Sequence, residues 1–310
     1  MSGISVIIPT YNGEATLRQL FPALAKQTEK GFELIVIDSS SRDGSTVLAK
    51  EAGAKLIVID QAEFDHGGTR NRAAAEAAGD ILVFLTQDAV PADDSALAHL
   101  LAPLRADASV SAVFGRQLPA TDAGPFAEHL RLFNYPDASF VRTLADKERF
   151  GLKTAFFSDS FSAYRRSSFE GAGRFLSGLL FGEDTCMAAK ILLAGGKTAY
   201  AADARVRHSH NYTIRQDFRR YFDIGAFHTM QTWLLDAFGK AESEGFRYVI
   251  SEVKFLLSKG KWHLLPSAAL RTAGKLFGYK FGRAFRKLPR GLVESLSMHR
   301  FWWKKRPGAL

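Results

Sequence analysis

The sequence predicts an α/β fold with a mostly parallel sheet, helices on both faces of that sheet, and a helical C-terminal extension. Two observations predict the sheet. Short apolar runs alternate with segments of helical periodicity over residues 1–90, and runs of this kind fit strands that are buried on both faces. A third observation predicts the extension, because beyond about residue 211 the pattern becomes helical.

Each element is predicted from its own stretch of sequence. Strands are expected at 4–9, 33–38, 55–59, 81–86, 110–117, within 155–165, and at 198–207. Helices are expected at 14–29, 44–53, 68–79, 92–107 and 183–194. Asp43 or Ser45 is expected to cap the second helix. Residues 118–150 contain three prolines and are expected to be irregular. Ligands of such sheets bind beyond the carboxyl ends of the strands, so the residues that follow each strand are the functional candidates.

The composition is typical of a folded protein that works outside the bilayer core. The chain has 310 residues, of which 46% are hydrophobic and 24% charged. Its uncharged stretches are shorter than the roughly 18–20 residues that a membrane-spanning helix needs. The amino terminus has no basic region before an apolar core, so we expect no secretory signal. The single cysteine, Cys186, excludes an internal disulfide and fits a reducing cytoplasmic setting.

The positive charge is concentrated at the C-terminal end. Residues 1–253 carry 27 Lys and Arg against 31 Asp and Glu, a net charge of −4, whereas residues 254–310 carry 14 against one, a net charge of +13. Such a segment suits either a nucleic acid or an anionic membrane surface. A solvated basic face is the simpler alternative.

The pattern inside this basic segment favours a membrane over a nucleic acid. On a helical wheel of 270–288, basic residues lie opposite an apolar side made of Leu270, Phe277, Phe281, Ala284, Phe285 and Leu288. Gly274, Gly278 and Gly282 recur every four residues, and each weakens the helix by about 1 kcal/mol unless another helix packs there. Trp302 and Trp303 beside three basic residues add the pattern of an interfacial anchor. Packing of these aromatic residues on the rest of the protein is the alternative.

Five ordered motifs resemble family 2 of the nucleotide-sugar glycosyltransferases, whose fold is the Rossmann-like GT-A fold. They are SVIIPTYNGE at 5–14, ELIVIDSSSRDGS at 33–45, TRNRAAAEAAGDILVFLTQDAVP at 69–91, GEDTCMAAKILLAGGK at 182–197 and ARVRHSH at 204–210. FDHGGTRN at 64–71 with TQDA at 86–89 is similar to rhamnosyltransferases of bacterial surface-polysaccharide synthesis. The resemblance implies a catalytic domain over 1–210 and a helical, membrane-associating region over 211–310.

The resemblance also implies a nucleotide-binding set: Thr10, Tyr11, Asn12, Asp38, His66, Gly67, Arg70, Gln87 and Asp88. Asp38 would accept the N3–H of a uracil or thymine ring, although Ser39 stands where many relatives carry a second acid. Arg70 is suited to bind a phosphate or a base carbonyl. The alternatives are a plain turn after the first strand, a helix cap or turn at Asp38, and a loop-stabilising role for His66.

A divalent metal is implied at Asp88 and His208. The family usually carries an Asp-x-Asp motif after the fourth strand, but this chain has Gln87-Asp88-Ala89, so one carboxylate remains. Diphosphate oxygens of the donor and His208 would complete the shell, and His210, two residues further on an extended chain, points to the same side. This ligand set suits Mn²⁺, with Mg²⁺ as the alternative. A purely structural Asp88 is the remaining alternative.

The catalytic residue implied by the resemblance is Asp184, with Glu183 binding the acceptor. Asp184 would accept the proton of the acceptor hydroxyl as its oxygen attacks the anomeric carbon, so one displacement with inversion needs one carboxylate base. The alternative is that the two acids only complement the N-terminal end of a helix.

The function that the resemblance implies is transfer of L-rhamnose from dTDP-L-rhamnose to a lipid-linked or growing bacterial glycan. The enzyme would work at the inner face of the cytoplasmic membrane, held there peripherally by residues 254–310. A UDP-hexose or UDP-N-acetylhexosamine donor is the first alternative. A catalytically silent membrane scaffold is the second, and a nucleic-acid partner is not expected.

Overall fold

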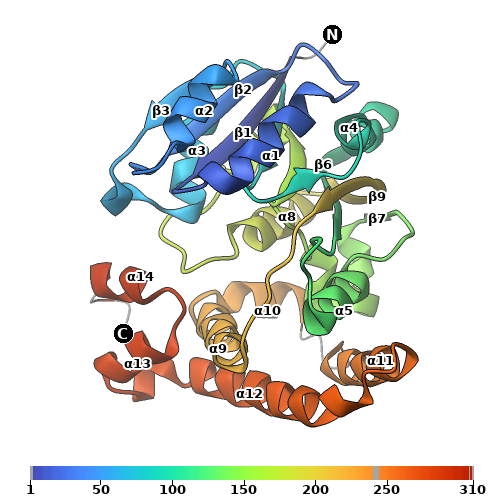
Figure 1. Ribbon diagram of the computed structural model, residues 1–310, viewed down its shortest axis with the longest axis vertical. Coiled ribbons are helices and arrows are strands. Elements are labelled where there is room, and N and C mark those ends of the chain that lie inside the picture. Colours follow the sequence, from blue (N-terminus) through green and yellow to red (C-terminus); the bar gives the residue numbers. More distant parts are fainter. Residues whose placement is uncertain (1–2, 240–243, 307, 309–310) are drawn as a thin grey trace.

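The computed structural model describes residues 3–239, 244–306 and 308, which form a twisted sheet above a bundle of C-terminal helices (Figure 1). The nine strands of this described part are β1 (Ile4–Thr10), β2 (Glu33–Asp38), β3 (Lys55–Val58), β4 (Ile81–Leu85), β5 (Val90–Pro91), β6 (Val110–Leu118), β7 (Phe140–Arg142), β8 (Phe161–Arg165) and β9 (Lys197–Arg207). Their order is β3-β2-β1-β4-β8-β6-β9-β5, and β7 pairs with β9.

The sheet is mostly parallel, as predicted. β3, β2, β1 and β4 are parallel neighbours, and β6 and β9 are parallel to each other. β8 lies between β4 and β6 and is antiparallel to both, so the two parallel groups run in the same direction. Their carboxyl ends therefore meet at one edge of the sheet.

The central strands are buried on both faces, which explains their uninterrupted apolar sequences. Val6 and Ile8 of β1 belong to the core on one side of the sheet, whereas Ile7 of the same strand belongs to the core on the other side. Side chains alternate across a strand, so a strand that is covered on both faces places its side chains in one core or the other and favours apolar residues.

The helices around the sheet begin and end close to the predicted places, with several differences. They are α1 (Glu14–Ala25), α2 (Ser45–Glu51), α3 (His66–Ala75), α4 (Ala96–Ala106), α5 (Pro125–Asn134), α6 (Lys147–Phe150), α7 (Arg166–Gly171) and α8 (Glu183–Leu193). Short 3₁₀ turns are η1 (Gln61–Glu63), η2 (Leu144–Asp146) and η3 (Gly151–Ala155).

Three expectations about these elements were wrong. Residues 118–150 are not irregular throughout, because α5 begins with Pro125 at its first turn, where a missing N–H costs nothing. α1 ends at Ala25 instead of residue 29. The N-cap of α2 is Gly44, while the Asp43 carboxylate accepts hydrogen bonds from the N–H and hydroxyl of Ser45.

The C-terminal region is helical, as predicted. It comprises α9 (Ile214–Met230), α10 (Thr232–Phe238), α11 (Glu244–Ser258), α12 (Leu265–Arg283), α13 (Arg290–Leu296) and α14 (Arg300–Lys305), with 3₁₀ turns η4 (Trp262–Leu264) and η5 (Phe285–Lys287). In Figure 1, α12 runs along the end of the molecule furthest from β1–β3. No helix of the described residues is both long enough and apolar enough to cross a bilayer.

Glycines allow α12 to lie directly against α9. A Cβ atom at Gly278 would lie 2.3 Å from the carbonyl oxygen of Phe218, and one at Gly282 would lie 2.0 Å from that of Phe222. Gly225 of α9 is equally close to the carbonyl oxygen of Tyr279. Gly278 and Gly282 of the repeat therefore make a close helix–helix contact, the condition under which their low helix propensity is tolerated, whereas a Cβ at Gly274 would lie 3.9 Å from its nearest neighbour.

The two tail tryptophans pack on the protein, which corrects the expectation of an interfacial anchor there. Trp303 is fully buried against Phe285, and the Trp302 indole N–H donates to the carbonyl of Gly178 at 3.1 Å. A row of aromatic and basic residues suits a protein surface as well as a lipid surface, so the sequence pattern alone did not distinguish the two.

Candidate active site

The loops that follow β1 and β4 are joined by the side chain of Gln87. Its Oε1 accepts the backbone N–H of Tyr11 at 2.9 Å, and its Nε2 donates to the carbonyl of Tyr11 at 3.2 Å. Thr10 is buried at the end of β1, and the Tyr11 side chain is exposed. Gln87, the residue directly before Asp88, thus fixes the backbone at the edge of the sheet.

The loops after β1 and β2 share a second network. Both carboxylate oxygens of the fully buried Asp38 accept hydrogen bonds from Ser41, at 2.8 Å from its N–H and 2.5 Å from its hydroxyl. The Ser41 hydroxyl in turn accepts the N–H of Asn12, and Asn12 Oδ1 accepts the N–H of Arg42. Asp38 therefore already has partners within the protein, and a contact between Asp38 and a nucleotide base remains a prediction.

Asp88, His208 and His210 form a group whose geometry suits a metal ion. Asp88 lies 3.4 Å from His208 Nε2 and 3.8 Å from His210 Nε2, and one ligand atom from each residue lies within 4.8 Å of the other two. Gln117 Oε1 lies 3.0 Å from Nδ1 of His208. That contact orients the ring with Nε2 toward Asp88, as second-shell partners of metal ligands do.

The charges in this group are those that metal binding needs. Burial opposes ionisation of Asp88, but the hydrogen bond and the charges of the two histidines outweigh it and hold the Asp88 pKa well below its usual range. Burial, with the neighbouring His208, lowers the pKa of His210 to about 4. At neutral pH the group thus offers an ionised carboxylate and a neutral His210, and ligands must be unprotonated to bind a metal.

A buried ion pair connects the start of α3 with the start of α8. Arg70 Nη1 donates to Glu183 Oε1 at 2.8 Å and to the carbonyl of His66 at 2.9 Å, and both charged side chains are buried. The structure thus pairs the Arg70 guanidinium with Glu183 and does not leave it free toward a phosphate. Gly67 is required by packing, because a Cβ there would lie 2.2 Å from the carbonyl oxygen of Leu176.

Asp184 lies next to this pair, in the first turn of α8. Burial, the charge of Glu183 and the charge of Asp159 together raise the pKa of Asp184 to about 8. Its Oδ1 accepts the N–H of Thr185 at 2.7 Å. A carboxylate whose proton affinity is raised toward neutral pH is suited to accept a proton from a hydroxyl group.

Asp159 was not found from the sequence. Its Oδ1 accepts hydrogen bonds from Ser162 at 2.6 Å and Tyr164 at 2.8 Å, while its buried Oδ2 has no hydrogen-bond partner among the described residues. Burial raises its pKa to about 6. Asp159 precedes β8, and an antiparallel strand brings the residue before it to the edge where parallel strands end. A search of only the residues that follow strands therefore missed Asp159.

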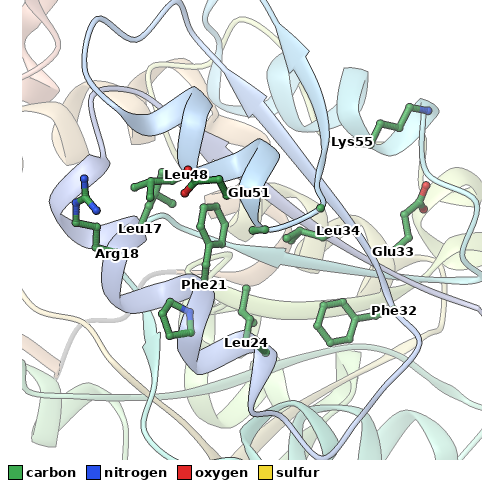
Figure 2. Close-up of a pocket in the computed structure, with 14 residues that line it drawn as sticks. Leu17, Arg18, Phe21, Leu24, Phe32, Glu33, Leu34, Leu48, Glu51 and Lys55 are labelled. Atoms are coloured by element: carbon green, nitrogen blue, oxygen red, sulfur yellow. The ribbon is translucent and has the colours of Figure 1, made fainter.

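A large apolar cavity lies away from these groups. It has a volume of about 720 Å³ and lies between α1 and α2. Figure 2 shows Phe21 and Leu24 of α1 beside Phe32, which precedes β2, and Leu34, which is partly buried near the start of β2. Glu33 and Lys55, the first residues of β2 and β3, also line it. The cavity is thus at the amino ends of these strands, opposite to the candidate site.

The comparison with known families assigns the chain. A model described as glycosyl transferase family 2 matches residues 5–173, more than half of the sequence. The chain belongs to this family. It is therefore a glycosyltransferase, and the resemblance drawn from its motifs is confirmed. Asp88 and Asp159 lie within the matched region, whereas Asp184, His208 and His210 lie beyond its end.

Curated relatives cover almost the whole chain. It is 46% identical to the O-antigen chain rhamnosyltransferase WbaN of Salmonella anatum, over 98% of this chain and 96% of the relative. It is 45% identical to the O-antigen chain rhamnosyltransferase RfbN of Salmonella typhimurium, over 97% of this chain and 96% of the relative. The C-terminal helices are therefore part of the similarity.

Solved structures share the fold. The mannosyltransferase PcManGT from Pyrobaculum calidifontis, in complex with GDP-Man and Mn²⁺, matches with a TM-score of 0.59 at 20% identity, over 98% of this chain and 86% of that one. Staphylococcus aureus TarS residues 1–349, in complex with UDP-GlcNAc, matches with a TM-score of 0.54 at 17% identity, over 92% of both chains. The predicted GT-A fold is confirmed.

Proposed function

We propose that this glycosyltransferase transfers L-rhamnose from dTDP-L-rhamnose to a lipid-linked or growing bacterial glycan, with inversion at the anomeric carbon. The observation that carries the proposal is the 46% identity, over nearly the full length, to an O-antigen chain rhamnosyltransferase. A UDP-hexose or UDP-N-acetylhexosamine donor is the alternative. The raised pKa of Asp184 and the Asp88 group argue against a silent scaffold, because a scaffold needs neither.

In the proposed reaction Asp184 accepts the proton of the acceptor hydroxyl. The hydroxyl oxygen forms a bond to the anomeric carbon while the bond between that carbon and the diphosphate breaks. Glu183 is held by Arg70 at 2.8 Å and would contact the acceptor. Buried Asp159 and Glu183 keep the proton affinity of Asp184 high, which favours transfer of the proton to it.

Asp88, His208 and His210 would hold a divalent cation, Mn²⁺ or Mg²⁺. Two imidazoles with one carboxylate fit Mn²⁺ better than Mg²⁺. When bound, the cation supplies positive charge to the leaving diphosphate. The observation that supports this assignment is the approach of one ligand atom from each residue to within 4.8 Å of the others.

We further propose that residues 1–210 are the catalytic domain and that the helical region brings it to an anionic membrane surface. One flank of α12 exposes Leu270, Phe277 and Phe281, and Trp262 just before it is 69% exposed. Exposed basic residues lie in the same segment of the chain: Lys261, Lys280, Arg283, Arg286 and Lys287. Apolar rings next to cations match the interface of an anionic bilayer. This set of exposed residues is called the α12 surface below.

Charge introduced into the α12 surface is expected to abolish vesicle binding. The double variant Phe277→Glu/Phe281→Glu should lose most co-sedimentation with anionic vesicles, because acidic groups enter the interface poorly and repel the lipid headgroups. Val47→Glu is the matched control, since Val47 is equally exposed, at 55%, on α2 of the catalytic domain. Equal binding of the double variant and the control would remove the membrane proposal.

The donor is tested with a panel of nucleotide sugars. We expect selective binding and slow hydrolysis of dTDP-L-rhamnose over UDP-glucose and UDP-N-acetylglucosamine, with a requirement for Mn²⁺. Preference for a UDP sugar would keep the fold and the mechanism but replace the rhamnosyl donor. Absence of binding to every nucleotide would support the scaffold instead.

A further inference from the structure

A second large cavity lies where the C-terminal helix α14 meets the segment before α3. Its volume is about 700 Å³. Contacts of α14 and of the residue after it border this cavity: the Trp302 indole donates to the carbonyl of Gly178 at 3.1 Å, and the Arg306 guanidinium lies 3.7 Å from the carboxylate of Asp65. Asp65 also caps α3 by accepting the N–H of Gly68 at 2.7 Å. We call this cavity the α14 pocket.

The wall of the α14 pocket carries unneutralised positive charge. Its two acids already have partners, because Glu63 lies 3.1 Å from Arg72 and Asp65 lies 3.7 Å from Arg306. Arg300 lines the pocket, is exposed, and has no ion-pair or hydrogen-bond partner among the described residues. A pocket of this kind attracts an anion.

The inner wall of the pocket lies next to the catalytic groups. The His66 and His299 rings meet edge to face at 5.6 Å, and burial lowers the pKa of both, that of His299 to about 4. These neutral rings are able to donate and accept hydrogen bonds. One nitrogen of Arg70 bonds both the carbonyl of His66 and the carboxylate of Glu183, so a single guanidinium separates the pocket from the acids of α8.

The pocket also has an exposed aromatic side chain in its wall. Phe301 lines the pocket and is 58% exposed. A ligand with phosphate at the cationic wall, polar groups at the inner histidines and a hydrocarbon tail past Phe301 would match all three regions. A phosphate-bearing glycolipid combines these properties.

We propose that the α14 pocket binds the phosphate-bearing end of the lipid-linked acceptor, with Arg300 contacting the phosphate and His66 and His299 facing the sugar. This proposal rests on the proposed function, because it gives the acceptor of that reaction a place. It assigns the C-terminal helix a binding role separate from that of the α12 surface.

The test measures the affinity of farnesyl diphosphate, a small amphiphilic diphosphate, by titration calorimetry with the full chain. Arg300→Glu is expected to weaken this affinity by about tenfold or more, because a positive charge beside the diphosphate becomes negative. Lys304→Glu is the matched control: Lys304 is the same kind of residue on the same helix, is exposed, and does not line the pocket. The control should stay within about twofold of the wild type.

Titration with dTDP separates this proposal from the proposed function. Both variants are expected to bind dTDP like the wild type, and a wild type that fails to bind dTDP would contradict the proposed function alone. Three results would overturn the pocket proposal: equal loss of farnesyl diphosphate affinity in the two variants, weaker dTDP binding in Arg300→Glu alone, or inorganic diphosphate binding as tightly as farnesyl diphosphate. The second result would assign the pocket to the donor, and the third to a free anion.

Discussion

Asp184→Asn is expected to lower the rate of sugar transfer by on the order of 1,000-fold while leaving the affinity for the nucleotide sugar almost unchanged. Asparagine keeps the size and the hydrogen bond from Thr185 but cannot accept the proton. The measurement is the transfer rate at saturating donor together with donor affinity by calorimetry. Full activity in this variant would remove Asp184 as the base.

The pH dependence gives the same prediction an independent readout. Since burial and the neighbouring acids raise the pKa of Asp184 from 3.8 to about 8, the rate should rise with pH until the carboxylate is ionised near pH 8. The folded state holds this proton over a range in which the unfolded chain has lost it. Stability from this group is therefore lost as the pH rises from about 4 to about 8.

Asp184→Asn removes the destabilisation that ionisation of the buried Asp184 carboxylate causes. The variant should therefore melt at a higher temperature than the wild type at pH 8. A variant that is inactive and more stable is folded, and its inactivity then reflects chemistry. Lower stability together with loss of donor binding would instead assign Asp184 a structural role. Glu183→Gln is less suitable as a test, because it leaves Arg70 buried without its charged partner.

Asp88→Ala is expected to weaken Mn²⁺ binding by on the order of 100-fold or more, since even outer-shell changes at metal sites cost about 10–100-fold. The effect should extend to donor binding measured with Mn²⁺ and be absent for dTDP measured without metal. Calorimetry of Mn²⁺ in the presence of dTDP gives both values.

Asp93→Ala is the matched control for that experiment. Asp93 is an aspartate five residues further along the same segment; it pairs with Arg205 at 2.9 Å and is not part of the histidine group. Its replacement should leave Mn²⁺ affinity unchanged. If a chelator has no effect on the wild-type reaction, the metal assignment is wrong whichever variant is used.

The sheet and the position of the site were predictable because they follow from local signals. Apolar runs such as the one within Glu33–Asp38 predict strands that are buried in the sheet. Parallel strands bring the residues that follow them to one edge of that sheet. The grouping of Asp88 with His208 and His210 follows from the same rule. The motif at Asp184 placed it at the start of a helix, and α8 begins at Glu183.

The other features of the site could not be predicted, because they depend on contacts between segments that are far apart in the sequence. Asp159 reaches the site because it comes just before a strand that runs opposite to its neighbours, and Gln117 orients His208 across 91 positions of sequence. Arg70 has the residue type expected for phosphate binding, yet a carboxylate 113 positions away takes up its charge. Trp303 has the sequence surroundings of a membrane anchor and is buried instead.

The central claim is that Asp184 drives a single displacement of a rhamnosyl group. The most direct test is the anomeric configuration of the glycoside that the wild-type enzyme forms from dTDP-L-rhamnose, a lipid-linked glycan acceptor and Mn²⁺, determined by NMR. The account predicts a configuration opposite to that of the donor and no product with Asp184→Asn. A product with the donor's configuration would contradict it, because retention requires a second displacement that one carboxylate base does not provide.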